Sequence, residues 1–101
     1  MVVYNLTTRV APGIAAAWRR WQQEKFIPAV LNSGFFSAHK LFHLVGHDEE
    51  DGITYVTQFF SSSLDDCSNF IQQEEKRLLQ HAAETWHDQV VSFSTVMEAV
   101  N

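Results

Sequence analysis

The chain has 101 residues, of which 46% are hydrophobic, and its formal net charge at pH 7 is −5. A chain of this length buries one core, so we expect a single domain over residues 1–101. The negative charge repels phosphate backbones and anionic lipid, which argues against nucleic acid and membrane surfaces as partners. No apolar run approaches the roughly 20 residues of a membrane span, and the first residues lack a signal-peptide pattern. A single cysteine, Cys67, excludes an internal disulfide. These features predict a cytoplasmic protein.

The first third of the sequence predicts a strand followed by a helix. Val2 to Arg9 alternates and is rich in β-branched residues, as is typical of a strand. Pro12 suits the first turn of a helix, and apolar residues recur behind it at helical spacing. Pro28 disfavours helical geometry at the residue before it. We therefore expect the helix to end or kink there, with a last turn closed by Gly34.

The remainder predicts a hairpin, a second helix and a last strand. Phe35 to Val45 and Ile53 to Phe60 alternate on either side of a polar, glycine-bounded turn. Ser63 and Asp66 form a capping-box pattern that opens an apolar helical stripe. Gln89 to Met97 returns to strand. The order βαββαβ predicts a ferredoxin-like α+β fold, with two helices on one face of a four-stranded antiparallel sheet.

The period of two divides the strand residues between the two sheet faces. The set expected to meet the helices is Tyr4, Leu6, Phe36, Ala38, Phe42, Leu44, Tyr55, Phe59, Val91 and Phe93. The opposite set is Val3, Asn5, Thr7, Phe35, Ser37, His39, Leu41, His43, Val45, Thr54, Val56, Gln58, Phe60, Val90, Ser92, Ser94 and Val96. This second set carries no fixed charge, although a solvated antiparallel face normally does. Lys40 falls among the helix-facing residues, a misfit that a bulge would resolve.

An uncharged sheet face built from four strands is expected to be covered from solvent. A second copy of the chain can cover it by two-fold pairing. The sequence therefore predicts a homodimer of the dimeric α+β barrel type. Asn5, His39, His43 and Gln58 would be costly in a dry interface, so we expect them to line a partly polar cavity that takes a small molecule. A purely structural or interaction dimer without a cavity is the alternative.

Several short motifs also carry a resemblance. They are Tyr4-Asn5, Trp18 and Trp21, Ile27-Pro28, Val30-Leu31, Gly34-Phe35, Gly52-Ile53-Thr54-Tyr55 and Gln58. Together they resemble domain-of-unknown-function family 4286 almost from end to end, which implies the fold and not an activity. The family pattern implies a histidine before Ile27-Pro28, where Phe26 stands in this chain.

The same architecture is shared by cofactor-free monooxygenases, and this gives an alternative function in which His39 or His43 is a general base. His39, His43 and His47 are spaced by four residues, which span about 13 Å on a strand, too far for two imidazoles to share a metal ion. The chain has no glycine-rich phosphate loop and no nucleophile elbow. We therefore expect neither a metal site nor a cofactor.

Overall fold

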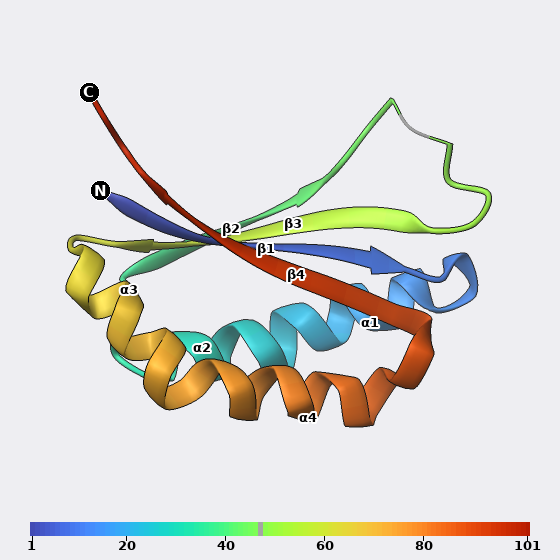
Figure 1. The fold of residues 1–101 in the computed structure, drawn as a ribbon. Helices are drawn as coiled ribbons and strands as arrows, with labels where there is room; N and C mark the ends of the chain where they lie inside the picture. Colours follow the sequence, from blue (N-terminus) through green and yellow to red (C-terminus); the bar gives the residue numbers. More distant parts are fainter. Residues whose placement is uncertain (47) are drawn as a thin grey trace.

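The structure is a computed structural model that describes residues 1–46 and 48–101, so that His47 lies outside the described residues. The elements in chain order are β1 (Val2–Val10), α1 (Ala15–Trp21), α2 (Ile27–Asn32), β2 (Ala38–His43), β3 (Ile53–Ser61), α3 (Leu64–Phe70), α4 (Lys76–Trp86) and β4 (Val90–Glu98). Strands pair antiparallel in the order β2-β3-β1-β4. The helices all lie on one side of the sheet (Figure 1), which confirms the ferredoxin-like α+β fold.

The first helix runs from α1 into α2 through one wider turn. Residues Gln22–Phe26 form a π-helical turn, in which the N–H of Ile27 donates to the carbonyl of Gln22 five residues earlier. Pro28 has no N–H to donate to a carbonyl in the preceding turn, so the widened turn accommodates the proline without ending the helix. The helix reaches Asn32, and Gly34, with a φ of +84°, terminates it as predicted.

The second helix begins with the predicted cap. Ser63 accepts a hydrogen bond from the backbone N–H of Asp66 at 3.1 Å. A π-helical turn, Ile71–Glu75, again separates the two α-helical parts, α3 and α4. None of the helices in the described part of the chain is both long and apolar enough to span a membrane.

The core lies between the sheet and the two helices. Phe59 is fully buried at its centre, with ring centroids 5.7 Å from Phe36 and 6.2 Å from Tyr4. A second cluster is built on Trp18, whose ring stacks on Tyr55 at 4.9 Å. The residues of β1 and β3 that alternation assigned to the helix side are all buried, so these two strands were divided correctly; they are Tyr4, Leu6, Tyr55 and Phe59.

The face assignment for β2 was wrong by one residue. His39 pairs with Phe59 and His43 pairs with Tyr55, and directly paired residues point to the same side of a sheet. Both histidines therefore lie on the helix side, whereas Lys40 and Phe42 lie on the side away from the helices. The strand begins at Ala38, after an irregular connection over 33–37 that breaks the alternation counted from Phe36. The misfit of Lys40 disappears with this shift.

The face assignment for β4 was also inverted. Ser92 pairs with Thr8, and the two hydroxyls are 3.0 Å apart on the helix side. Val91 and Phe93 therefore lie on the side away from the helices, with exposed fractions of 65% and 60%. Alternation alone does not say which set points inward, and here the smaller serines do so because they have hydrogen-bond partners there.

Candidate functional site

The side of the sheet away from the helices, here called the open face, is the uncovered upper side in Figure 1. It consists of Ala38, Lys40, Phe42, Thr54, Val56, Gln58, Phe60, Val3, Asn5, Thr7, Arg9, Val91, Phe93, Thr95 and Met97. The strand register arranges these residues in rows that cross all four strands. One row, the polar row, is Lys40, Gln58, Asn5 and Thr95.

Mostly apolar rows, here called the apolar rows, flank the polar row on both sides. One contains Phe42, Val56, Thr7 and Phe93, and the other contains Ala38, Phe60, Val3 and Met97. Phe42, Phe93 and Met97 are exposed by 45%, 60% and 43%, although aromatic and thioether side chains gain most from burial. The open face is therefore more apolar than the sequence predicted, and it carries two charges that the prediction excluded, Lys40 and Arg9.

One side-chain hydrogen bond joins two members of the polar row, and a second links this pair to the neighbouring row. Gln58 donates from Nε2 to Oδ1 of Asn5 at 3.3 Å, and Asn5 donates from Nδ2 to the Thr7 hydroxyl at 3.3 Å. A depression of about 410 Å³ lies beside this pair, lined by Phe42, His43, Leu44, Val45, Val56 and Gln58. Each amide keeps hydrogen-bonding capacity beyond these contacts. The arrangement suits a mostly apolar molecule with one or two polar atoms.

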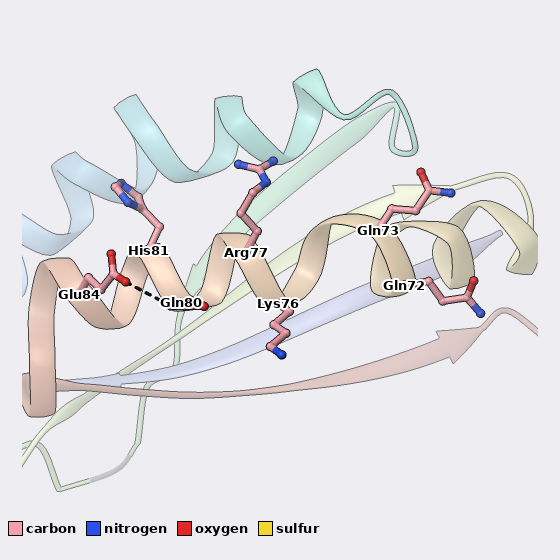
Figure 2. Close-up of a pocket in the computed structure, with 7 residues that line it drawn as sticks. All are labelled: Gln72, Gln73, Lys76, Arg77, Gln80, His81 and Glu84. Atoms are coloured by element: carbon pink, nitrogen blue, oxygen red, sulfur yellow. Dashed lines mark hydrogen bonds between the residues drawn. The ribbon is translucent and has the colours of Figure 1, made fainter.

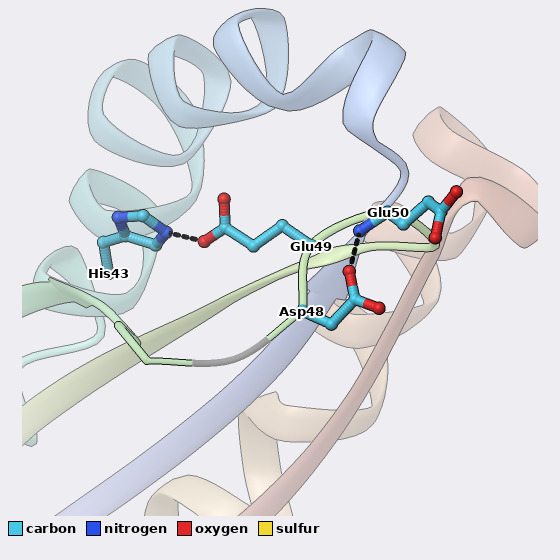
Figure 3. A network of polar contacts seen from close by, with 4 residues as sticks. All are labelled: His43, Asp48, Glu49 and Glu50. Atoms are coloured by element: carbon cyan, nitrogen blue, oxygen red, sulfur yellow. Dashed lines mark hydrogen bonds and ion pairs between the residues drawn. The ribbon is translucent and has the colours of Figure 1, made fainter.

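The structure separates the four predicted site residues into two groups. Asn5 and Gln58 lie together on the open face. His39 and His43 belong to the helix side of the edge strand β2, where His39 is exposed. His43 Nε2 contacts Glu49 Oε1 of the hairpin, and the Asp48 carboxylate accepts from the Glu50 N–H at 2.9 Å (Figure 3).

A second depression, of about 180 Å³, lies on the helix side of β2. It is lined by Arg19, Gln23, Leu41, Phe42, His43 and Tyr55. The His43 ring lies 5.4 Å from the Tyr55 ring, and the Arg19 guanidinium lies 6.0 Å from the centroid of Tyr55. A histidine oriented by a carboxylate is the usual arrangement of a general base.

A polar network that the sequence did not predict lies between the sheet and the second helix. Tyr4, with 1% exposure, donates from its hydroxyl to Glu75 Oε2 at 2.6 Å, and the Ser94 hydroxyl donates to the same oxygen at 2.9 Å. Gln22 is also buried and donates to the Thr57 hydroxyl at 3.1 Å. Gln22 opens one π-helical turn and Glu75 closes the other. The wider turns thus place polar side chains beneath the sheet, a detail that side-chain periodicity does not reveal.

Burial, with the added effect of the Glu75 hydrogen bond, raises the pKa of Tyr4 well above its ordinary value of 10.0. Burial likewise raises the pKa of the Cys67 thiol, so Cys67 is no thiolate nucleophile near neutral pH. Both side chains therefore stay protonated at neutral pH, and neither can act as a nucleophile or a base there. We interpret this network as structural.

The raised pKa of Tyr4 predicts a loss of stability in alkali. Above pH 10 the unfolded tyrosine ionises while the folded one stays neutral, so the free energy of unfolding falls by up to about 1.4 kcal/mol per pH unit. Tyr4→Phe removes this contribution. Urea unfolding of both proteins between about pH 9 and about pH 11 measures the difference in slope. If the free energy of unfolding fell equally steeply with pH in the two proteins, Tyr4 would not be the group responsible.

The outer surface of the second π-helical turn and α4 carries a depression of about 570 Å³, shown in Figure 2. Its lining is Gln72, Gln73, Lys76, Arg77, Gln80, His81 and Glu84, all on one helical segment. Gln80 donates to Glu84 at 3.3 Å, and Arg77 pairs with Glu74 at 2.5 Å. Because no second element closes this depression, it is a solvated surface groove.

Among residues 1–46 and 48–101, no group of three or more His, Cys, Asp or Glu side chains could hold a metal ion.

Similar solved structures share the fold at low identity. A protein of the ethyl tert-butyl ether d (EthD) family from Bacillus halodurans has a TM-score of 0.67 and 13% identity, with 99% of this chain and 100% of that chain covered. SnoaB, a cofactor-independent oxygenase from Streptomyces nogalater, has a TM-score of 0.63 and 15% identity over 99% and 94%. A de novo designed ferredoxin-fold protein also matches, with a TM-score of 0.54 and 12% identity over 100% and 88%. The likeness therefore establishes the fold and no activity.

No curated protein matches the chain. The model of one family, described as a domain of unknown function (DUF4286), matches residues 1–100. This match agrees with the motifs noted in the sequence, which extend from Tyr4 to Gln58. The chain belongs to the DUF4286 family.

Proposed function

We propose that the protein is a homodimer whose two open faces pack together and enclose a small molecule along the polar row. One observation carries this proposal. The open face combines exposed apolar side chains, such as Phe42 and Phe93, with a hydrogen-bonded amide pair beside a depression of about 410 Å³. The single cysteine, Cys67, cannot form an internal disulfide, which supports action in a reducing cytoplasm.

The size of the open face supports pairing with a second copy. Four strands about 4.8 Å apart and about eight residues long give a flat area of about 500 Å². Side-chain relief raises the accessible area toward the roughly 800 Å² per partner of a stable interface. A two-fold axis brings the same apolar rows of both copies together, so each open face buries the other and no different partner surface is needed.

The amide pair supports a ligand between the sheets. A dry interface would leave part of the hydrogen-bonding capacity of Asn5 and Gln58 unused, at a cost of about 1 to 3 kcal/mol for each unsatisfied group. A ligand with a carbonyl or hydroxyl group removes that cost, and the flanking apolar rows contact the rest of the molecule. The volume of the depression suits a ligand of modest size.

A second candidate function is that of a cofactor-free enzyme of the monooxygenase type. The observation that favours it is the contact of His43 with Glu49, beside both the open-face and the helix-side depression. In this function His43 is a general base that takes a proton from an electron-rich substrate. This second function requires catalytic turnover of a substrate, whereas the first candidate requires binding only.

Native mass spectrometry of the purified protein and of Gln58→Leu tests the first candidate. We expect a wild-type dimer with extra bound mass, and a Gln58→Leu dimer whose occupancy falls at least about tenfold, because the amide contact is lost. Gln72→Leu, an exposed position on the helix layer, is the matched control and keeps the bound mass. A wild-type dimer without bound mass indicates a structural or interaction dimer, and a wild-type monomer contradicts the proposal.

A further inference from the structure

The charges on the open face are all positive. Lys40 and Arg9 are its only charged members, and none of the open-face residues is acidic. This differs from the whole chain, which has twelve acidic and seven basic residues. The imbalance is therefore local to this surface.

The two cations occupy different places. Arg9 is in an outer row, and its side chain lies against Gly52, the residue before β3 begins. Lys40 is in the polar row, directly opposite Gln58, with Ala38 and Phe42 as its neighbours on the same side of β2. A lysine stem spans about 6 Å, so the ammonium group can reach over the neighbouring strand toward the amide pair.

Pairing of two open faces removes these cations from water. A two-fold dimer brings two Lys40 side chains into one interface, and no acidic residue on either open face neutralises them. Charges held in an interface are stable only when they are paired. An anion bound between the sheets supplies that pair.

We propose that the enclosed molecule is an organic anion, a carboxylate on a ring or a short aliphatic body, and that Lys40 binds its charged group. This inference rests on the proposed dimer and names the chemical class of its ligand. The ammonium group and the Gln58 Nε2 are donors for the two carboxylate oxygens. Phe42, Val56 and Phe60, in the rows on either side, contact the apolar body.

The test compares anions with neutral molecules of the same shape. Isothermal titration calorimetry measures six affinities of the wild-type dimer. The ligands are benzoate, 1-naphthoate, octanoate and the three corresponding amides. We expect at least one carboxylate to bind tenfold or more tightly than its amide. In Lys40→Met that preference disappears while the amide affinity is unchanged, and Lys40→Arg retains the preference.

A second measurement does not depend on choosing the right ligand. Sedimentation equilibrium in anion-poor buffer should show a dimer Kd at least threefold lower for Lys40→Met than for the wild type, because two like charges no longer enter the interface. Lys76→Met, an exposed lysine of α4 with the same change in charge, leaves the dimer Kd and all ligand affinities unchanged.

Three results would overturn the inference. Amides that bind as tightly as carboxylates would show that charge plays no part. A weaker dimer in Lys40→Met would show that Lys40 pairs with an acidic group of the other copy. A carboxylate preference that survives Lys40→Met would assign the anion to another cation. Failure of the proposed function gives a different result, because the wild type is then monomeric or its dimer binds none of the six compounds.

Discussion

Phe93→Glu is expected to convert the proposed dimer into a folded monomer. The side chain is 60% exposed in the single chain, so the substitution costs the monomer little. In the paired state each copy would place one unpaired carboxylate in an apolar row, at about 3 to 5 kcal/mol per charge. We therefore expect the dimer Kd to rise at least a thousandfold, measured by sedimentation equilibrium, with an unchanged circular dichroism spectrum.

Ala16→Glu is the control for Phe93→Glu, because Ala16 is exposed on α1 in the helix layer and the variant has the same added charge. It should leave the dimer intact. A Phe93→Glu protein that remains a dimer would show that β4 lies outside the interface. Loss of the dimer in both variants would point to a general effect of net charge.

Phe59→Ala should have the largest effect on folding stability. Phe59 is fully buried and contacts Tyr4 and Phe36, so truncation leaves a cavity at the centre of the core. Such a change costs about 3 to 5 kcal/mol, a large share of the 5 to 15 kcal/mol that stabilises a typical domain. Urea unfolding of the monomeric Phe93→Glu protein, with and without Phe59→Ala, measures the loss free of any dimer contribution.

The neighbouring residue provides the comparison for Phe59. Phe60 has the same side chain but lies on the open face, and it is only half-buried in the single chain. In the same monomeric background Phe60→Ala should cost less than about 1.5 kcal/mol, since it removes few core contacts. Similar losses for the two variants would contradict the assignment of opposite faces to Phe59 and Phe60.

The side of the sheet that each residue of the central strands β1 and β3 faces was predictable from the sequence. In β1 and β3, the large apolar Tyr4, Leu6 and Phe59 fall on one side of the strand by alternation, and the polar Asn5 and Gln58 fall on the other. Both strands are paired on two sides, so a shift by one residue would bury the polar set. The capping of the second helix by Ser63 was predictable for a similar local reason, because one hydroxyl satisfies one backbone N–H.

The edge strands were not predictable in the same way. In β2 the alternation counted from Phe36 fails because the strand begins only at Ala38. In β4 the apolar Phe93 lies outward, whereas Ser94 points inward to Glu75. An edge strand is paired on one side only, so partners such as the Thr8 and Glu75 side chains decide its register.

The candidate site was therefore predicted in part. Asn5 and Gln58 were assigned to the open face because they lie on the central strands, and the structure brings them within 3.3 Å. Lys40 was missed as a site residue, although its misfit among helix-facing positions was the signal that could have revealed it. Glu75 gave no signal, since its contact with Tyr4 joins residues 71 positions apart.

Small-angle X-ray scattering of the wild-type protein tests the central claim, that the open faces cover each other, most directly. The single chain has a Cα radius of gyration of 13.5 Å and extents of 38 × 30 × 19 Å. Sheets stacked about 10 Å apart give a compact dimer with a radius of gyration of about 17 Å. A dimer joined edge to edge would exceed about 20 Å, given neighbouring strands about 4.8 Å apart and a chain 30 Å wide. A value near 17 Å is the predicted result, and a value near that of the single chain or above about 20 Å would contradict the account.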